Sequence, residues 1–269
     1  PRRAGAVPVD GSALGAAPSW WHLAAAGSGV PAVELRSEGT LGDWCQVSAD
    51  FRGAYYGVAP FLVDDPAGEL GDGDAFPALV TVGLVDPAEC LWGKRPTRHG
   101  RRPWRAPRVD LARLEAESDL GPWARARLVP KVVVATQTRV VEAAVDAGGQ
   151  WLPSTPLISA VADPGRLWHL AAALSSPPVS AWALHRWGGT ALSAGGLKLS
   201  AAQVRAIPSP PPGAGWDEAA AALREASTAA DATGRRRWLR AAGEASSRAY
   251  GVPDSAVVDW WEARLPAER

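Results

Sequence analysis

The chain has 269 residues, 47% of them hydrophobic, and its 28 basic side chains balance 28 acidic ones. This length and apolar content predict one large domain or two smaller ones with hydrophobic cores, and they exclude disorder throughout. No apolar run approaches the roughly 20 residues of a membrane-spanning helix, so we expect no membrane partner. The two cysteines have no CxxC or zinc spacing and are typical of free thiols in a cytoplasmic protein.

The N-terminal stretch 1–38 is expected to be an entry segment with a short helix over 20–26, and it has no apolar core like that of a signal peptide. Residues 39–63 mix strand-like alternation with glycine breaks. The stretch 66–75 has the Gly and Asp content of a loop. Strands are expected over 76–86, 132–135, 140–145 and 155–162, with a hairpin turn in "DAGGQW" (146–151).

Helices are expected over 109–119, 163–176, 176–189 and most of 216–265, with a helical turn inside 197–208. Asp163 and Ser176 each precede a proline and are therefore N-cap candidates, and Gly188 is a stop signal. These elements predict an α/β region with a mixed sheet and flanking helices over 39–208. A proline-rich linker (209–215) and an all-α C-terminal region (216–269) follow it.

Motifs for catalysis or metal binding do not emerge from the sequence. Two glycine pairs, in 27–29 and 213–215, do not follow strands, and "ALSAGG" (191–196) lacks the first glycine of a GxSxG elbow. The four histidines have no metal-ligand spacing, and Cys45 and Cys90 are expected to be free thiols. Asp64 and Asp65 are expected to be solvated. We therefore predict no catalytic residue and no metal site in this chain.

A basic run, "KRPTRHGRRPWRAPR" (94–108), is the strongest binding signal. It contains seven cations and no acid, while the other 254 residues carry 21 basic and 28 acidic side chains, a net charge of −7. The seven are Lys94, Arg95, Arg98, Arg101, Arg102, Arg105 and Arg108. Such a loop is typical of a site that binds phosphates. The alternative is a solvated loop whose cations pair with nearby acids, and the run alone leaves both interpretations open.

Two further stretches combine polar and aromatic groups. In "FRGAYYG" (51–57), Arg52, Tyr55 and Tyr56 stand between glycines, and we expect one tyrosine ring to point inward and one outward. In "TQTR", Gln137, Thr138 and Arg139 follow a buried strand. Gln and Arg side chains can form paired hydrogen bonds with base edges. Packing and ordinary turn chemistry are the competing interpretations of these residues.

The order of these pieces resembles the C-terminal target-recognition region of N6-adenine DNA methyltransferases, in the type IIG and type I-like restriction–modification and phage-defence group. The resemblance rests on "GTLGDWCQVSADFRGAYYG", "FPALVTVGLVDPAECLWGKRP", "PKVVVATQTRVVEAAVD", "LWHLAAALSSPPVSAW" and "LKLSAAQVRAIPSPP", in that order. It implies a DNA-reading domain without catalytic residues. In this family a separate catalytic domain with an Asn-Pro-Pro-Tyr-type motif binds S-adenosylmethionine, and this chain has no such motif.

The expected partners are therefore double-stranded DNA and a methyltransferase catalytic domain or subunit, with S-adenosylmethionine bound outside this chain. The expected DNA contacts are Arg52, Tyr55, Tyr56, Lys94, Arg95, Arg98, Arg101, Arg102, Arg105, Lys131, Gln137, Thr138 and Arg139. A non-catalytic protein–protein docking module of a larger defence complex is the alternative. A third option, an enzyme with its own site, predicts S-adenosylmethionine binding by this chain alone.

Overall fold

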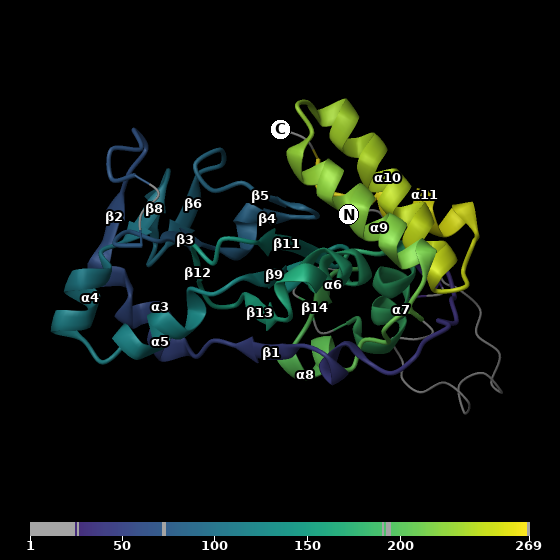
Figure 1. Cartoon of the computed structure of the whole chain (residues 1–269), viewed down its shortest axis with the longest axis horizontal. Helices are drawn as coiled ribbons and strands as arrows, with labels where there is room; N and C mark the ends of the chain where they lie inside the picture. The colour runs from purple at the N-terminus through teal and green to yellow at the C-terminus, as the bar shows by residue number, and fades with distance from the viewer. Residues whose placement is uncertain (1–24, 26, 72–73, 190, 192–194, 268–269) are drawn as a thin grey trace.

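The computed structural model describes residues 25, 27–71, 74–189, 191 and 195–267 (Figure 1). Within these ranges the chain forms two four-stranded sheets, three two-stranded sheets and a series of helices that dominates its C-terminal part. The predicted class, an α/β fold followed by a helical C-terminal region, is confirmed.

The first four-stranded sheet has the strand order β1-β13-β9-β11, and each strand is antiparallel to its neighbours. Its strands are β1 (Gln46–Ala49), β13 (Ile158–Val161), β9 (Lys131–Ala135) and β11 (Glu142–Asp146). Every residue of β9 is buried, as expected for its apolar run 132–135, and Lys131 at its start is buried as well. Ala49 aligns with Ile158 and Ile158 with Val134, so β1 and β9 end at the same edge of the sheet.

The second four-stranded sheet has the order β12-β3-β8-β2, with β12 parallel to β3 and the other pairs antiparallel. Its strands are β12 (Trp151–Pro153), β3 (Ala78–Val80), β8 (Pro107–Val109) and β2 (Leu62–Asp64). The predicted hairpin at 146–151 is therefore wrong, because β11 and β12 belong to different sheets. The Asp146 carboxylate accepts hydrogen bonds from the backbone N–H groups of Gln150 and Trp151, both at 3.0 Å, and stabilises the turn between the sheets.

Two helices, α4 (Leu111–Glu117) and α5 (Gly121–Arg127), pack on the second sheet. They complete a hydrophobic cluster of Val58, Phe61, Leu79, Val109, Leu111, Leu114, Ala124 and Leu152. Helix α4 is the helix expected over 109–119, and its N-cap Asp110 accepts the Arg113 N–H at 3.1 Å. Helix α5 was not predicted.

The secondary structure of two segments differs from the one predicted from the sequence. The strand expected over 76–86 is divided into β3, a 3-10 turn (Val82–Leu84) and β4 (Val85–Asp86), which pairs with β5 (Glu89–Cys90). In the segment 39–63, the residues after β1 form a short helix, α3 (Arg52–Gly57). Glycine content thus hid a helix that carries three of the expected DNA contacts.

Helices α6 (Leu167–Leu174) and α7 (Pro177–Trp187) confirm the predicted caps. The Ser176 hydroxyl accepts the Val179 N–H at 3.3 Å, and Asp163 accepts the Gly165 N–H at 2.8 Å at the start of a 3-10 turn that leads into α6. Gly188 is the C-cap of α7. An N-cap side chain contributes about 1 kcal/mol to helix stability.

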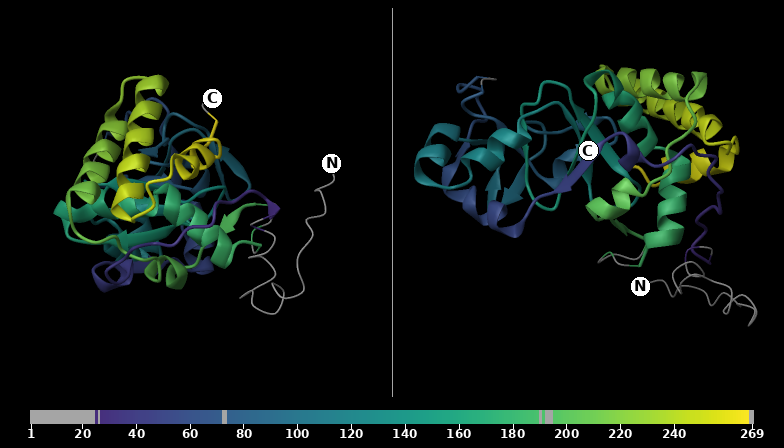
Figure 2. Two further views of the ribbon diagram at one scale, coloured as in Figure 1. Left: turned by 90° about the vertical axis from the view of Figure 1, so that its right-hand side faces the viewer. Right: turned by 60° about the horizontal axis from the view of Figure 1, so that its bottom comes forward.

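The C-terminal region consists of α9 (Ala214–Thr228), α10 (Ala232–Ala249) and α11 (Ser255–Glu262), and α9 and α10 lie side by side (Figure 2). A short strand β14 (Leu197–Lys198) and helix α8 (Ala201–Arg205) precede them. Trp216, Leu223 and Trp261 are buried in the same hydrophobic cluster as strands β9 and β13. The C-terminal helices therefore share one core with the first sheet.

Of the helix expected over 20–26, only Ala25 is described, and residues 192–194 of "ALSAGG" also lie outside the described residues. Among the described helices, none is long and apolar enough to cross a membrane.

Candidate nucleic-acid interface

The basic run forms a β-hairpin rather than the expected loop. Strands β6 (Thr97–His99) and β7 (Arg102–Trp104) are antiparallel, and Gly100 and Arg101 form the turn between them. Both turn residues have positive φ, +57° and +67°, as a type I′ turn requires. Arg98, Arg101 and Arg102 therefore lie on a paired β-hairpin and not on an irregular loop.

Three of the seven cations are paired with carboxylates. Lys94 contacts Glu89 at 2.9 Å, and Arg95 makes two hydrogen bonds with Asp86, at 3.0 and 3.1 Å. Arg108 donates to Asp65 at 2.9 Å, and its side chain is only 5% exposed. The expectation that Asp65 is solvated is therefore wrong. This part of the run matches the alternative interpretation, in which nearby acids balance the loop.

The other four cations, Arg98, Arg101, Arg102 and Arg105, are exposed. No carboxylate lies within ion-pair distance of them among the described residues. Arg98 donates to the Arg101 carbonyl at 3.2 Å, and the Arg102 guanidinium lies 4.9 Å from the centre of the buried Trp104 ring. Asp64 is used differently, since its carboxylate accepts the backbone N–H groups of Arg105 and Ala106. These four guanidinium groups remain available for an anionic partner.

Tyr55 connects the hairpin to helix α3. Its hydroxyl accepts the Gly100 N–H at 3.1 Å, and its carbonyl accepts from His99 Nε2 at 2.9 Å. The two rings lie 4.3 Å apart, and His99 Nδ1 accepts from the Ser154 hydroxyl at 3.2 Å. Burial lowers the pKa of His99, although the bond to the Tyr55 carbonyl opposes that effect. The neutral ring therefore holds the hairpin against α3 and the end of β12.

Arg52 and Tyr56, the other two expected DNA contacts on α3, lie on the surface beside Tyr55. Tyr56 is 56% exposed while Tyr55 is half-buried, so the expectation of one inward and one outward ring is confirmed. Arg52 donates to the Tyr56 hydroxyl at 3.3 Å and lies 5.4 Å from its ring centre. The structure thus brings together the FRGAYYG residues and the hairpin, which are far apart in sequence.

The third expected group, Gln137–Arg139, lies on another small sheet. Strand β10 (Gln137–Thr138) pairs with β14, and Gln137 and Arg139 are exposed while Thr138 is half-buried. The group follows β9 at the sheet edge where α3 follows β1. On one side of the segment 155–156, the Thr155 hydroxyl donates to the Phe51 carbonyl before α3. On the other side, the Pro156 carbonyl accepts from the Thr136 hydroxyl before β10. The segment 155–156 therefore separates α3 from β10.

Lys131 is not a surface cation, and its expected role in DNA binding is wrong. Its side chain is 0% exposed and forms an ion pair with the buried carboxylate of Asp146. Burial lowers the pKa of Lys131, and the neighbouring Asp146 opposes this shift. A lysine enclosed in this way cannot reach a phosphate on the surface.

The two cysteine side chains lie away from the surface, Cys45 buried and Cys90 half-buried. Burial raises the pKa of Cys45 to about 11 and that of Cys90 to about 12, so both thiols are protonated at neutral pH. Both are free, as predicted. In the described part of the chain, no three His, Cys, Asp or Glu side chains are grouped to hold a metal ion.

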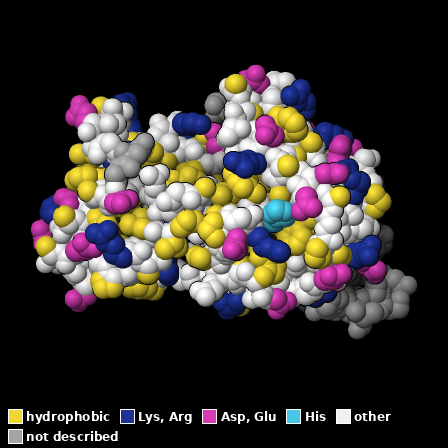
Figure 3. All heavy atoms as spheres, viewed as in Figure 1, with side chains coloured by type: hydrophobic (Ala, Val, Ile, Leu, Met, Phe, Trp, Pro, Cys, Tyr) yellow, Lys and Arg dark blue, Asp and Glu magenta, His cyan; other side chains and the backbone are white. Residues whose placement is uncertain are grey.

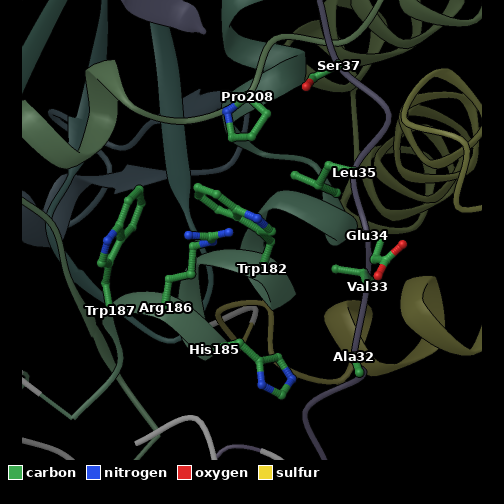
Figure 4. A pocket seen from close by; sticks show the side chains of 10 residues that line it. All are labelled: Ala32, Val33, Glu34, Leu35, Ser37, Trp182, His185, Arg186, Trp187 and Pro208. Atoms are coloured by element: carbon green, nitrogen blue, oxygen red, sulfur yellow. The ribbon is translucent and has the colours of Figure 1, made fainter. Parts of the chain in front are cut away.

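A separate cavity of about 650 Å³ lies between α7 and residues 32–37 (Figure 4). The Trp182 and Trp187 rings meet edge to face at 4.9 Å, and Arg186 lies between them, 4.7 Å from the Trp182 ring centre. His185 Nε2 donates to the carbonyls of Val30 and Pro31, which holds the segment beside α7. None of the expected DNA contacts is among the described residues that line the cavity.

The basic and acidic groups are dispersed over the face shown in Figure 3, with hydrophobic side chains across its middle. This distribution fits a chain of zero net charge. The available cations of the hairpin are therefore a local feature and not part of a generally basic surface.

Phe51 is the residue at this site that sequence reasoning missed. It is 54% exposed at the start of α3, and its ring meets Trp123 edge to face at 6.4 Å. A phenylalanine at the end of an alternating strand pattern is usually buried, so the sequence held no signal for its exposure.

In comparisons with known proteins, no protein-family model and no curated protein matches the chain.

Proposed function

We propose that this chain binds double-stranded DNA and selects the target sequence for an adenine-specific DNA methyltransferase. One observation carries the DNA-binding part of the proposal. Arg98, Arg101 and Arg102 are exposed on one hairpin and Arg105 directly after it, with no carboxylate partner among the residues that the structure describes. Phosphate oxygens suit such groups, because guanidinium–phosphate hydrogen bonds are strong and often paired.

The rigid attachment of the hairpin supports this role. Tyr55, His99 and Ser154 connect it to two other elements, so the backbone that carries the cations is held in place before DNA arrives. A pre-ordered backbone loses less conformational freedom on binding. Phosphate contacts fix the position of a protein on the duplex but carry no sequence information themselves.

Sequence selection would then depend on Arg52, Gln137 and Arg139, which are exposed and can form paired hydrogen bonds with base edges. The ordered series of motifs that resembles methyltransferase recognition regions supports the link to adenine methylation. In this proposal a separate catalytic domain or subunit binds S-adenosylmethionine, and the present chain supplies only the DNA contacts.

Salt dependence of DNA binding tests the proposal. Fluorescence anisotropy with a labelled duplex would be recorded from 50 to about 300 mM NaCl for the wild type and for Arg98→Gln/Arg101→Gln/Arg102→Gln. Each lost phosphate contact lowers the slope of log K against log salt by about 0.9, so the triple variant should lose about 3 from the slope.

The matched control is Arg113→Gln/Arg125→Gln, which removes two exposed arginines that are paired with Glu117 and Glu115. We expect this control to bind DNA within about two-fold of the wild type. A wild type that does not raise the anisotropy of the duplex, or a flat salt response, contradicts the proposal. Selection from random duplexes tests base reading, and Gln137→Ala should relax the preference at one position.

A second candidate function is docking to another protein, and the cavity between α7 and residues 32–37 favours it. Its paired tryptophans and central arginine are residue types that are enriched at protein interfaces. Docking to a catalytic subunit predicts that Trp182→Ala weakens assembly in analytical ultracentrifugation. The hairpin variants should then assemble normally.

A further inference from the structure

The exposed aromatic side chains of this protein gather at α3. Phe51 (54% exposed) and Tyr56 (56%), together with Leu70 (39%), are the large hydrophobic residues classed as exposed within the described ranges. In contrast, every tryptophan that the structure describes is buried or half-buried. The exposure of two rings within six residues is therefore a local property of α3 and its N-cap.

The Phe51 ring is held in place without being covered. A Cβ atom on Gly53 would lie 2.9 Å from Cε2 of Phe51, so the ring rests directly against the glycine backbone. Trp123 meets the ring edge to face, and the Asp50 carboxylate accepts the Trp123 indole N–H at 2.9 Å. Gly53 and Trp123 thus fix the ring, while Phe51 as a residue stays 54% exposed.

Tyr56 is fixed in a similar way. Its ring meets the Tyr55 ring edge to face at 5.1 Å, and Tyr55 is anchored to the hairpin by the Gly100 N–H. The Arg52 guanidinium lies beside the ring, 5.4 Å from its centre. A fixed aromatic ring next to a guanidinium group offers two planar surfaces on which a base can stack.

Exposed rings among cations are typical of sites that bind nucleic acid with unstacked bases, because every base has a face that can stack on an aromatic side chain. An intact duplex hides those faces inside its own stack. Side chains that insert at base steps unstack them locally, and a base that is already unpaired is easier to engage.

We propose that Phe51 and Tyr56 stack on DNA bases that have left the duplex stack, so that this chain binds DNA with an unstacked nucleotide more tightly than intact duplex. This inference rests on the proposed DNA-binding function and names the form of DNA that the site prefers. The hairpin arginines hold the flanking phosphates, and the two rings add contacts that only exposed bases can make.

The test compares three labelled DNAs of equal length: an intact duplex, the same duplex with one unpaired central nucleotide, and one single strand. Affinities would be measured for the wild type, Phe51→Leu, Tyr56→Leu and Gly53→Ala. Leucine keeps an apolar side chain without a ring, and the new Cβ of Gly53→Ala displaces the Phe51 ring without removing it. Leu70→Ala is the matched control for loss of an exposed apolar group.

We expect the wild type to bind the bulged duplex at least about five-fold more tightly than the intact one, as stacking of one base allows. Phe51→Leu and Gly53→Ala should lose most of this preference and bind intact duplex within about two-fold of the wild type, and Tyr56→Leu should lose most of the preference as well. Leu70→Ala and Phe51→Trp should keep it. Thermal unfolding of each variant confirms that it is folded.

Equal affinity of the wild type for intact and bulged duplex overturns the inference and leaves the proposed function standing. The same conclusion follows if the leucine variants retain the preference. Absence of binding to all three DNAs overturns the proposed function together with the inference. 2-Aminopurine as the unpaired nucleotide itself gives a second readout, since stacking on a ring quenches its fluorescence.

Discussion

The hydroxyl of Tyr55 accepts the backbone N–H of Gly100 at 3.1 Å, and this bond joins helix α3 to the tip of the basic hairpin. The residues are 45 positions apart in sequence. Tyr55→Phe removes the bond and leaves the ring contact with His99. It should cost about 0.5–1.5 kcal/mol of stability, the usual net value of such a bond.

Hydrogen exchange at the Gly100 amide measures this effect directly, and we expect exchange to become about ten-fold faster in Tyr55→Phe, which is a change of about 1.4 kcal/mol. Tyr56→Phe is the control, because its hydroxyl accepts from the exposed Arg52 and not from the hairpin. That variant should leave Gly100 exchange unchanged. Equal protection of Gly100 in both variants would show that Tyr55 does not hold the hairpin.

The buried pair of Lys131 and Asp146 predicts a large loss of stability when one partner is removed. Asp146→Ala leaves a lysine side chain that is 0% exposed without its carboxylate, and such a change costs about 3 kcal/mol or more. Glu117→Ala breaks an exposed pair with Arg113 and should cost less than about 1 kcal/mol. Urea unfolding measures both, and similar losses would contradict the burial of Lys131.

Glu142 predicts a fall in stability with rising pH. Burial, and then the nearby Asp86, raises the pKa of this carboxyl from 4.5 to about 8, while Arg95 lowers it. Between these two values the folded protein holds a proton that the unfolded chain has released. The free energy of unfolding therefore decreases as the pH rises through this window.

Glu142→Gln removes the titrating group and keeps its size. We expect the variant to lose this part of the pH dependence and to have the higher Tm at pH 8–9. Melting curves from pH 5 to 9 make the comparison. Two parallel profiles of Tm against pH would exclude a raised pKa at this position.

Gly149 and Gly68 form a matched pair for backbone packing. Both have positive φ, +67° and +71°, but a Cβ on Gly149 would lie 2.7 Å from the Val129 carbonyl carbon, while Gly68 has no atom within 4 Å of that position. Gly68→Ala should cost about 1 kcal/mol from its conformation alone. Gly149→Ala should cost about 1–3 kcal/mol more, because backbone atoms must move. Chemical denaturation of both variants tests this difference.

Local signals in the sequence were sufficient for much of the fold. Asp163 and Ser176 before proline predicted the starts of the α6 and α7 segments, because N-caps satisfy backbone groups within three residues. The apolar run at 132–135 predicted a buried strand, and β9 confirms it. The prediction of a hairpin turn at 146–151 was wrong because distant residues decide which sheet a strand joins. Here β12 pairs with β3, which lies far from it in the sequence.

The candidate site shows the same limit. Cation density identified the basic run, but Arg108 is neutralised by Asp65 and Lys131 by Asp146, and neither pairing has a local signature. The contact between Tyr55 and Gly100 likewise depends on the folded arrangement. Composition can indicate that a segment is basic, while only the tertiary structure shows which cations are available.

At Arg101, backbone stability and the supply of an available cation favour different residues. As the second turn residue of the hairpin it has φ +67°, a conformation that costs an arginine about 1–2 kcal/mol and that asparagine adopts more readily. Arg101→Asn should therefore make the fold more stable while it removes one of the available cations. Selection for thermal robustness alone would favour replacing this arginine. Its presence at the turn is the pattern expected where a protein trades stability for activity.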